Sequence, residues 1–243
     1  MLISYSHRFI FFHVPKVAGI SIREALKNYA EEPGRFKINR PNRQINGNPN
    51  PLYEMWKSSL LHAKAIEVKK ELTEKLYKRF FKFAFVRNPW DWQISMYHFI
   101  LKEPAHVRHH LVKSMAGFDE YLDWVIQNKN PYPKGATKFQ KEILTDKDGQ
   151  LMVNFIGRYE TLEDDFKEVC DYLKISASLP RLNRTDHKDY RSYYKEQTIK
   201  KVEEHFKEDI ELFGYKFDGF QTKAPGVGKL QPISDETDSN NPL

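Results

Sequence analysis

The feature that most constrains the fold is a short apolar run, Arg8–Val14, that stops at Pro15. A run of aromatic and β-branched residues of this length is typical of a buried strand. After a turn over Pro15–Gly19, apolar residues recur at helical spacing. These are Ile22, Ala25, Leu26 and Tyr29. A strand, a tight loop and a helix in this order predict the opening unit of a nucleotide-binding type of α/β fold.

A second buried strand is predicted over Phe80–Val86, ending at Arg87, with a helix that begins at Pro89 in its N1 position. Elsewhere the pattern predicts helices around 65–76, 116–129, 162–173 and 199–210, and a strand at Leu151–Ile156. Thr161 and Asp164 have the spacing of a capping box that opens the third of these helices. We therefore expect an α/β fold, a single P-loop-like domain with a central, mainly parallel sheet flanked by helices.

A chain of 243 residues is long enough for one large α/β domain. We expect this domain to occupy residues 1–220. Residues 31–58 are rich in Pro, Asn and Gly and predict a long surface loop, a kind of segment that is often functional. From residue 221 the periodicity is lost, which predicts a disordered tail over 221–243.

Charge, cysteine content and hydropathy limit the class of protein. The formal net charge is +6, and the segment from Lys57 to Arg87 alone contains nine basic and three acidic residues. This segment could face an anionic partner or simply be solvated. The single cysteine, Cys170, excludes a disulfide within the chain. No stretch approaches 18 apolar residues and no signal peptide is apparent, so we expect a soluble, cytoplasmic protein without a membrane span.

Two strand–loop–helix junctions carry the candidate chemistry. In His13–Ser21, small residues let backbone N–H groups converge on an anion at the start of a helix, and Lys16 adds a charge. The lysine precedes Gly19 by three residues, unlike the Gly-Lys-Ser/Thr of a magnesium-dependent ATP site, so no metal is expected. At the second junction, Arg87 leaves a strand end and Ser95 lies about two helical turns beyond Pro89. Two neighbouring anion sites suit a nucleotide phosphorylated at both ends.

These two junctions resemble the motifs of the sulfotransferases that use 3′-phosphoadenosine 5′-phosphosulfate (PAPS). The segment Phe9–Ser21 is similar to their 5′-phosphosulfate loop, and Phe83–Asp91 with Ser95 is similar to their 3′-phosphate motif. The order and spacing match the carbohydrate branch, which includes the heparan sulfate 2-O- and 6-O-sulfotransferases and bacterial relatives. Phe155–Glu160 and Leu179–Arg184 are also similar to bacterial members, so the resemblance spans about residues 8–216.

The resemblance implies a role for each matching residue. Lys16 would contact the 5′-phosphosulfate, and Arg87 and Ser95 would hold the 3′-phosphate. The loop amides that would cradle the phosphate belong to Val17, Ala18, Gly19, Ile20 and Ser21. Asn183 and Arg184 would help to bind the nucleotide. Ile20 departs from the pattern, since this position usually holds Thr or Ser.

Transfer to a hydroxyl also requires a base, and a histidine is well matched to this task. His62 lies in a Leu-His-Ala context like that of the general base in heparan-type enzymes, and His13 is the rival at the mouth of the loop. Either histidine could instead make only a structural hydrogen bond. The expected reaction is a direct in-line transfer, in which Lys16 and the loop amides neutralise the charge that grows on the leaving oxygen.

The resemblance implies PAPS as the donor and the hydroxyl of a carbohydrate or glycoconjugate as the acceptor, in a bacterial-type cytoplasmic enzyme. A non-carbohydrate hydroxyl is the alternative acceptor. A nucleotide kinase and a basic nucleic-acid-binding module are alternatives of other classes. The missing Gly-Lys-Ser/Thr argues against the kinase, and no helix-turn-helix or RNA-binding signature supports nucleic acid as a partner. The sequence does not indicate an oligomeric state.

Overall fold

A four-stranded sheet lies at the centre of the computed structural model, which describes residues 1–31, 44–45, 48–49, 61–132, 136–180, 188–221, 224 and 227–233. The strands are β1 (Leu2–Ser4), β2 (Phe9–Phe12), β3 (Gln44–Ile45), β4 (Asn48–Pro49), β5 (Phe81–Val86), β6 (Phe155–Arg158), β7 (Tyr215–Lys216) and β8 (Gly219–Phe220). The helices are α1 (Gly19–Leu26), α3 (Ala65–Glu71), α4 (Glu74–Lys78), α5 (Pro89–Lys102), α6 (His109–Lys113), α7 (Phe118–Gln127), α8 (Lys141–Leu144), α9 (Leu162–Leu173), α10 (Glu196–His205) and α11 (Lys207–Phe213), with short 3₁₀ helices η1 (Lys27–Tyr29) and η3 (Tyr190–Tyr193).

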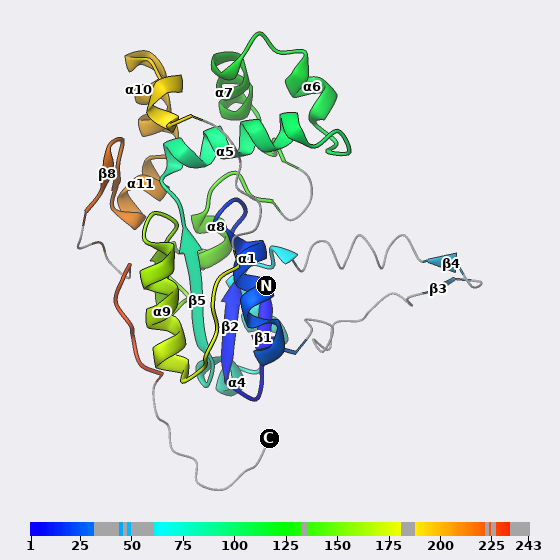
Figure 1. The fold of residues 1–243 in the computed structure, drawn as a ribbon, viewed down its shortest axis with the longest axis vertical. Coiled ribbons are helices and arrows are strands. Elements are labelled where there is room, and N and C mark those ends of the chain that lie inside the picture. The colour runs from blue at the N-terminus through cyan, green and yellow to red at the C-terminus, as the bar shows by residue number, and fades with distance from the viewer. Residues whose placement is uncertain are drawn as a thin grey trace, which may run out of the picture.

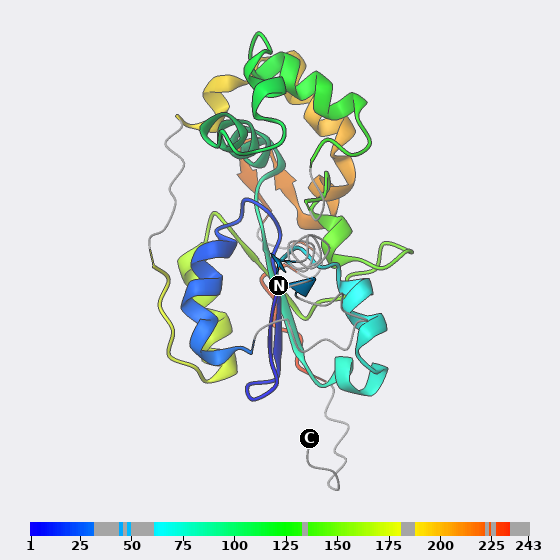
Figure 2. The same ribbon diagram turned by 90° about the vertical axis from the view of Figure 1, so that its right-hand side faces the viewer.

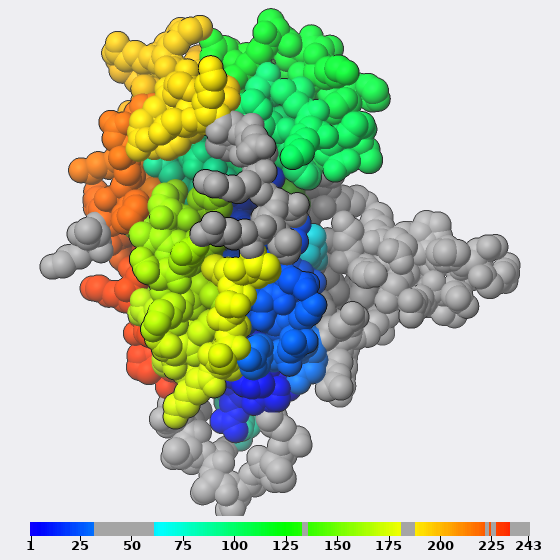
Figure 3. Space-filling view, in the orientation of Figure 1, coloured from blue at the N-terminus to red at the C-terminus, as the bar shows by residue number. Residues whose placement is uncertain are grey.

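The strand order of the central sheet is β1-β2-β5-β6, with β2, β5 and β6 parallel and β1 antiparallel at the edge. Helices α1 and α9 cover one face of this sheet, and α3, α4 and α8 cover the other (Figure 2). The space-filling view shows α1 and α9 on the first face, with the segment that follows α9 between them (Figure 3). This arrangement confirms the expected α/β fold with a central, mainly parallel sheet.

The two central strands are apolar except for Lys82, because both faces of the sheet are covered. Every residue of β2 and β5 is buried, including the aromatic residues Phe9, Phe11, Phe81 and Phe83. The Phe83 ring lies 5.4 Å from the Phe11 ring and 5.9 Å from the Phe9 ring, measured between centroids. Parallel strands buried on both faces need continuous apolar runs, and this is the pattern by which the two strands were predicted.

A second group of helices lies beyond the carboxyl ends of the parallel strands. Helices α5, α6, α7, α10 and α11 gather there, above the sheet in Figure 1. Helix α5 begins at Pro89, as predicted, and Asn88 caps it by accepting a hydrogen bond from the Trp90 amide at 3.0 Å. The edge of the sheet where the two candidate junctions meet is therefore bordered by this helical group.

Three local expectations need correction. The strand expected at Leu151–Ile156 lies at Phe155–Arg158, because Leu151 instead pairs with Thr145 to close a turn. The capping box at Thr161 does not form: its hydroxyl donates to Asp165 at 2.9 Å, and Asp164 is not involved. The last long helix is two helices, α10 and α11, which break at Phe206.

The chain after residue 220 also differs from the expected disordered tail where the structure describes it. Val227 pairs in parallel with Ile156 of β6, and the Gln231 amide donates to the Asn154 carbonyl at 3.1 Å. Ala224 and Val227 are buried. The edge of β6 offers unpaired backbone groups, and these residues satisfy some of them. Residues 234–243, and most of the 31–58 loop apart from Glu31, β3 and β4, lie outside the described residues.

We expect Phe83→Ala to lower the free energy of unfolding by about 3–5 kcal/mol, since it leaves a cavity between β2 and the covering helices. Urea denaturation followed by circular dichroism measures this loss. Val107→Ala is the control, since Val107 is 74% exposed and its loss should change stability by less than about 0.5 kcal/mol. A loss below about 1 kcal/mol for Phe83→Ala would contradict the packing described here.

Candidate functional site

The site begins where two parallel strands end side by side. Phe12 at the end of β2 pairs with Ala84 of β5, so the loop that follows β2 and the residue that follows β5 emerge at the same edge of the sheet (Figure 1). In open α/β sheets, ligands bind at this edge, outside the carboxyl ends of the strands. The two junctions identified in the sequence are therefore brought together by the sheet itself.

The loop between β2 and α1 has an unusual backbone. Lys16 has φ 63° and Ala18 has φ 59°, although residues with a side chain rarely adopt the left-handed region. Alternation of left-handed residues in a turn before a helix forms the kind of concavity in which backbone N–H groups bind anions. The strain of two such residues, of order 1–3 kcal/mol each, is typical of functional sites. Ala18 is also the N-cap residue of α1, so the N-terminus of the helix adds its positive dipole end here.

A close contact at Gly19 fixes the shape of this loop. A Cβ atom at Gly19 would lie 1.9 Å from two atoms of the His13 ring. The first turn of α1 can thus approach the end of β2 only because residue 19 has no side chain. Ile20, the next residue, is 56% exposed.

Lys16 and Arg87, the two cations predicted to hold phosphates, meet in the structure. The Arg87 Nη1 donates to the Lys16 carbonyl at 3.3 Å. Burial, together with the smaller effects of the Arg87 and Lys102 charges, lowers the pKa of Lys16 to about 8. The Lys16 Nζ lies 4.1 Å from the centroid of the Phe99 ring on α5. Two cations that destabilise one another create a site that favours an anion.

The Arg87 guanidinium is enclosed, with 5% of its side chain exposed. Its Nε donates to Asp91 Oδ2 at 2.8 Å, one helical turn along α5. The guanidinium also lies over the Tyr159 ring, with Cζ 4.1 Å from the centroid. The bond to Asp91 uses one edge of the guanidinium and fixes its plane, which prepares the group for a planar, bidentate contact with an anion.

Ser95 lies two turns into α5 and is fully buried. Its hydroxyl has no hydrogen-bond partner among the described residues. A buried hydroxyl without a partner is costly in a folded protein, and a bound ligand group would satisfy it. The residues present therefore fit a doubly phosphorylated nucleotide: a strained anion loop with Lys16, Arg87 two residues before α5, and an unsatisfied hydroxyl within that helix.

His13 and His62 form a pair beside the loop. The His62 Nδ1 lies 2.7 Å from the His13 carbonyl, and the two ring centroids are 4.6 Å apart. Because a carbonyl can only accept, Nδ1 of His62 carries the proton and Nε2 has the free lone pair. Burial lowers the pKa of His62 to about 4, although the hydrogen bond to His13 opposes this shift. His62 is thus a neutral, oriented imidazole.

His13 is more deeply enclosed than His62. Only 4% of the residue is exposed, and its Nδ1 has no partner among the described residues. Burial is the main cause that holds the pKa of His13 well below its usual range. The ring stacks on Phe11 and contacts Gly19, so it fills the space between the end of β2 and the first turn of α1.

The structure places His62 against His13 and Arg87 against the Lys16 carbonyl, so two distant segments of the chain meet the loop after β2. Asn183 and Arg184 lie outside the described residues. Three side chains at the site were not singled out as ligand-positioning groups from the sequence: Phe99, Tyr159 and Gln140. The Gln140 side chain binds the backbone of Arg87, 53 residues away, and no local pattern signals such a contact.

Trp92 links the two junctions as well. Its indole Nε1 donates to the Pro15 carbonyl at 2.8 Å, so α5 is tied directly to the loop after β2. Both Trp92 and Trp90 are buried. These side chains therefore pack within the fold.

A comparison with protein-family models assigns the chain. The model of the sulfotransferase family matches residues 1–216. The chain belongs to the sulfotransferase family.

Membership of this family makes the chain a PAPS-dependent sulfotransferase. A similar solved structure is that of mouse sulfotransferase SULT7A1 complexed with PAP, with 14% sequence identity and a TM-score of 0.46. The similarity covers 86% of this chain and 85% of that one. No match was found among curated proteins.

The described residues give no candidate for a metal site and none for a membrane-spanning helix. Within the ranges that the structure describes, no group of three or more His, Cys, Asp or Glu side chains is placed to hold a metal ion. Among the helices described, none is long and apolar enough to cross a membrane.

We expect Gly19→Ala to displace the His13 ring and, through the His13 carbonyl, the His62 ring. Such overpacking costs about 1–3 kcal/mol of stability. Urea denaturation measures the loss, and the His62 imidazole signals in a proton–nitrogen NMR spectrum should shift. Ile20→Ala is the matched control, because it changes the neighbouring, exposed residue. Unchanged His62 signals in Gly19→Ala would show that residue 19 does not set the position of the histidine pair.

Proposed function

We propose that the chain moves a sulfuryl group from PAPS to a hydroxyl of a carbohydrate or glycoconjugate by direct in-line transfer. PAPS supplies the activated sulfuryl group when bound. The loop amides from Val17 to Ser21 and Lys16 bind the 5′ end of the donor, and Arg87 and Ser95 bind its 3′-phosphate. Asn183 and Arg184 belong to the same proposal as further nucleotide contacts.

The observation that carries this proposal is the meeting of Lys16 and Arg87 at one sheet edge beside a neutral histidine pair. Both cations are largely withdrawn from water, and Arg87 contributes to the lowered pKa of Lys16. Preorganised positive groups in a site of low dielectric stabilise developing negative charge far better than water does. In this proposal, Lys16 neutralises the charge on the leaving oxygen.

His62 is our candidate for the base. Its Nδ1–H is held by the His13 carbonyl, which leaves Nε2 to take the proton of the acceptor hydroxyl. With a pKa of about 4 in the free protein, the ring is neutral at physiological pH. A polyanionic donor bound at the neighbouring loop favours the protonated ring and raises this pKa, which makes the base stronger when it is needed. His13, with its more enclosed ring, is the second candidate.

Carbohydrate as the acceptor rests on the sequence motifs of the carbohydrate branch. A non-carbohydrate hydroxyl is the alternative acceptor, and an acceptor screen with both classes distinguishes them. The cytoplasmic location stays a prediction, and cell fractionation tests it.

Calorimetric titration with 3′-phosphoadenosine 5′-phosphate (PAP), the desulfated product, tests the donor site. We expect metal-free binding that is much tighter than that of adenosine 5′-phosphate (AMP), and about a hundredfold weaker for Arg87→Ala because a buried charge contact is lost. Lys78→Ala, which removes an exposed cation near the other end of β5, should leave the affinity unchanged.

Equal or better binding of ATP with Mg²⁺ would contradict the proposal and favour a kinase. Binding of duplex nucleic acid with a steep salt dependence and no preference for PAP would favour the nucleic-acid-binding alternative.

The titration of His62 provides a second test. In the free protein we expect the ring to stay neutral as the pH falls, until the pH approaches about 4. Saturation with PAP should raise this pKa by at least one unit, because the bound phosphates stabilise the imidazolium. Histidine NMR with His62→Gln for assignment measures both values. In an acceptor screen, His62→Gln should lose transfer and keep its affinity for PAP, and retention of full transfer would exclude His62 as the base.

A further inference from the structure

The backbone of Arg87 is held by the side chain of Gln140, the residue that precedes α8. The Arg87 amide donates to Gln140 Oε1 at 2.9 Å, and Gln140 Nε2 donates to the Arg87 carbonyl at 2.8 Å. The pairing of β5 with β6 ends at Val86, whose carbonyl accepts from the Tyr159 amide at 2.7 Å. Gln140 therefore gives Arg87 the pair of hydrogen bonds that a neighbouring strand would give, at the point where the sheet has none to offer.

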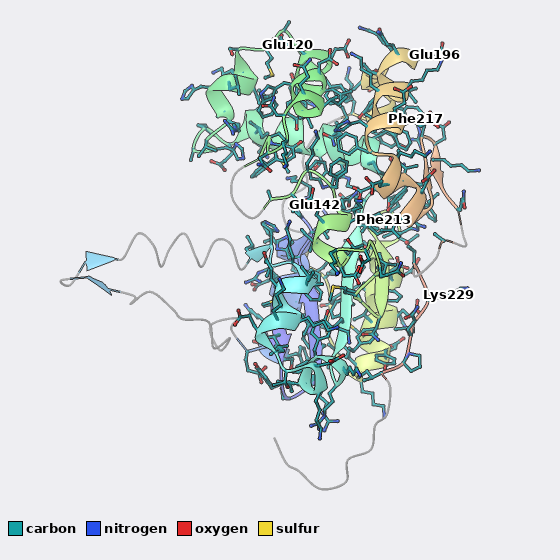
Figure 4. All side chains as sticks on the ribbon, turned by 180° about the vertical axis from the view of Figure 1, so that it is seen from behind. Glu120, Glu142, Glu196, Phe213, Phe217 and Lys229 are labelled. Carbon is teal, nitrogen blue, oxygen red and sulfur yellow. The ribbon has the colours of Figure 1, made fainter. Side chains whose placement is uncertain are left out.

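Gln140 is itself fixed by a buried carboxylate. The carboxylate of Asp209 on α11 accepts hydrogen bonds from two backbone N–H groups at the N-terminus of α8. The donors are Gln140, at 2.7 Å, and Lys141, at 2.9 Å. Gln140 and Asp209 are 2% and 1% exposed. Helix α11 packs on α8, and Figure 4 shows Glu142 of α8 and Phe213 of α11 close together near the top of the sheet. A rigid chain of contacts thus runs from α11 through α8 to the end of β5.

This chain of contacts determines where the Arg87 side chain leaves the sheet. Arg87 Nη1 reaches the Lys16 carbonyl at 3.3 Å, so a shift of the Arg87 backbone would change the spacing between the two anion-binding segments. A bidentate contact to an anion loses most of its strength when the guanidinium moves by about an ångström. A buried carboxylate is expensive to maintain, and burial raises the pKa of Asp209 to about 7.

We propose that Gln140 and Asp209 are positioning residues that hold Arg87 in the place from which it selects a nucleotide with a 3′-phosphate. Neither side chain contacts the nucleotide in this assignment. Gln140 fixes the Arg87 backbone, and Asp209 fixes Gln140. The inference rests on the proposed function, in which Arg87 binds the 3′-phosphate.

A purely structural role would predict a different result, so the readout must separate stability from selectivity. The readout is the ratio of the dissociation constants for AMP and PAP, measured by calorimetry, because these ligands differ only in the 3′-phosphate. A general loss of stability weakens the binding of AMP and PAP alike and leaves the ratio unchanged. Misplacement of Arg87 weakens the binding of PAP alone and therefore lowers the ratio. Asn154 offers a matched control: its Oδ1 accepts from the Lys82 amide at 3.0 Å, near the opposite end of β5. Thermal denaturation of each variant runs alongside.

For Gln140→Met we expect the ratio of the dissociation constants to fall by about tenfold or more. We expect this ratio to fall for Asp209→Asn as well. Asn154→Leu should destabilise the protein and leave the ratio unchanged. In the Arg87→Ala background, Gln140→Met should lower the ratio no further, because the two residues act through one contact. An unchanged ratio in Gln140→Met, or full additivity with Arg87→Ala, would overturn the proposal.

Two outcomes separate this inference from the proposed function. If the wild-type protein does not prefer PAP to AMP, or Arg87→Ala keeps the preference, the proposed donor site fails and the inference fails with it. If that preference holds and depends on Arg87 but not on Gln140, only the inference fails. Should Gln140→Met not fold, Gln140→Glu replaces it, since this variant keeps one acceptor oxygen and places a charge against the Arg87 carbonyl; the same ratio decides.

Discussion

The parallel pairing of β2 with β5 is the constraint on which the rest of this molecule depends. Antiparallel strands would put the loop after β2 and the residue after β5 at opposite edges of the sheet. The observed register, with Phe12 opposite Ala84, instead brings Lys16 and Arg87 close enough for a hydrogen bond from the guanidinium to the Lys16 carbonyl. Helix α5 strengthens this junction through Trp92 and Asp91, which bind the Pro15 carbonyl and the Arg87 guanidinium.

Withdrawal from water sets the charge state of the groups around this junction. The same burial lowers the pKa of Lys16 to about 8 and that of His62 to about 4, and raises that of Asp209 to about 7. Each shift opposes the charged form of the group. The site therefore holds its cations at a cost that an anionic ligand relieves, while its histidines remain neutral and able to accept a proton.

In the loop after β2, a strained backbone and a close contact at Gly19 together determine the shape of the candidate site. Lys16 and Ala18 adopt left-handed backbone, and Gly19 lets α1 touch the His13 ring. The His13 carbonyl then accepts from His62. One short segment thus shapes the anion loop on one side and orients the candidate base on the other. A change at residue 19 should disturb both.

Local patterns in the sequence were sufficient for the strands β2 and β5 and for the helix that begins at Pro89. The roles of Lys16, Arg87, His13 and His62 come from the resemblance to the family and stay predictions. Continuous apolar runs and helical spacing reflect burial on both faces, so they can be recognised within a short window. The break at Phe206 and the pairing of Val227 with β6 were not predictable in this way. Only the tertiary structure places Gln140 on the Arg87 backbone, Asp209 on Gln140, and Phe99 under Lys16. The physical reason is that each of these contacts joins residues far apart in sequence, and its energy depends on distances that exist only after the sheet and helices have packed.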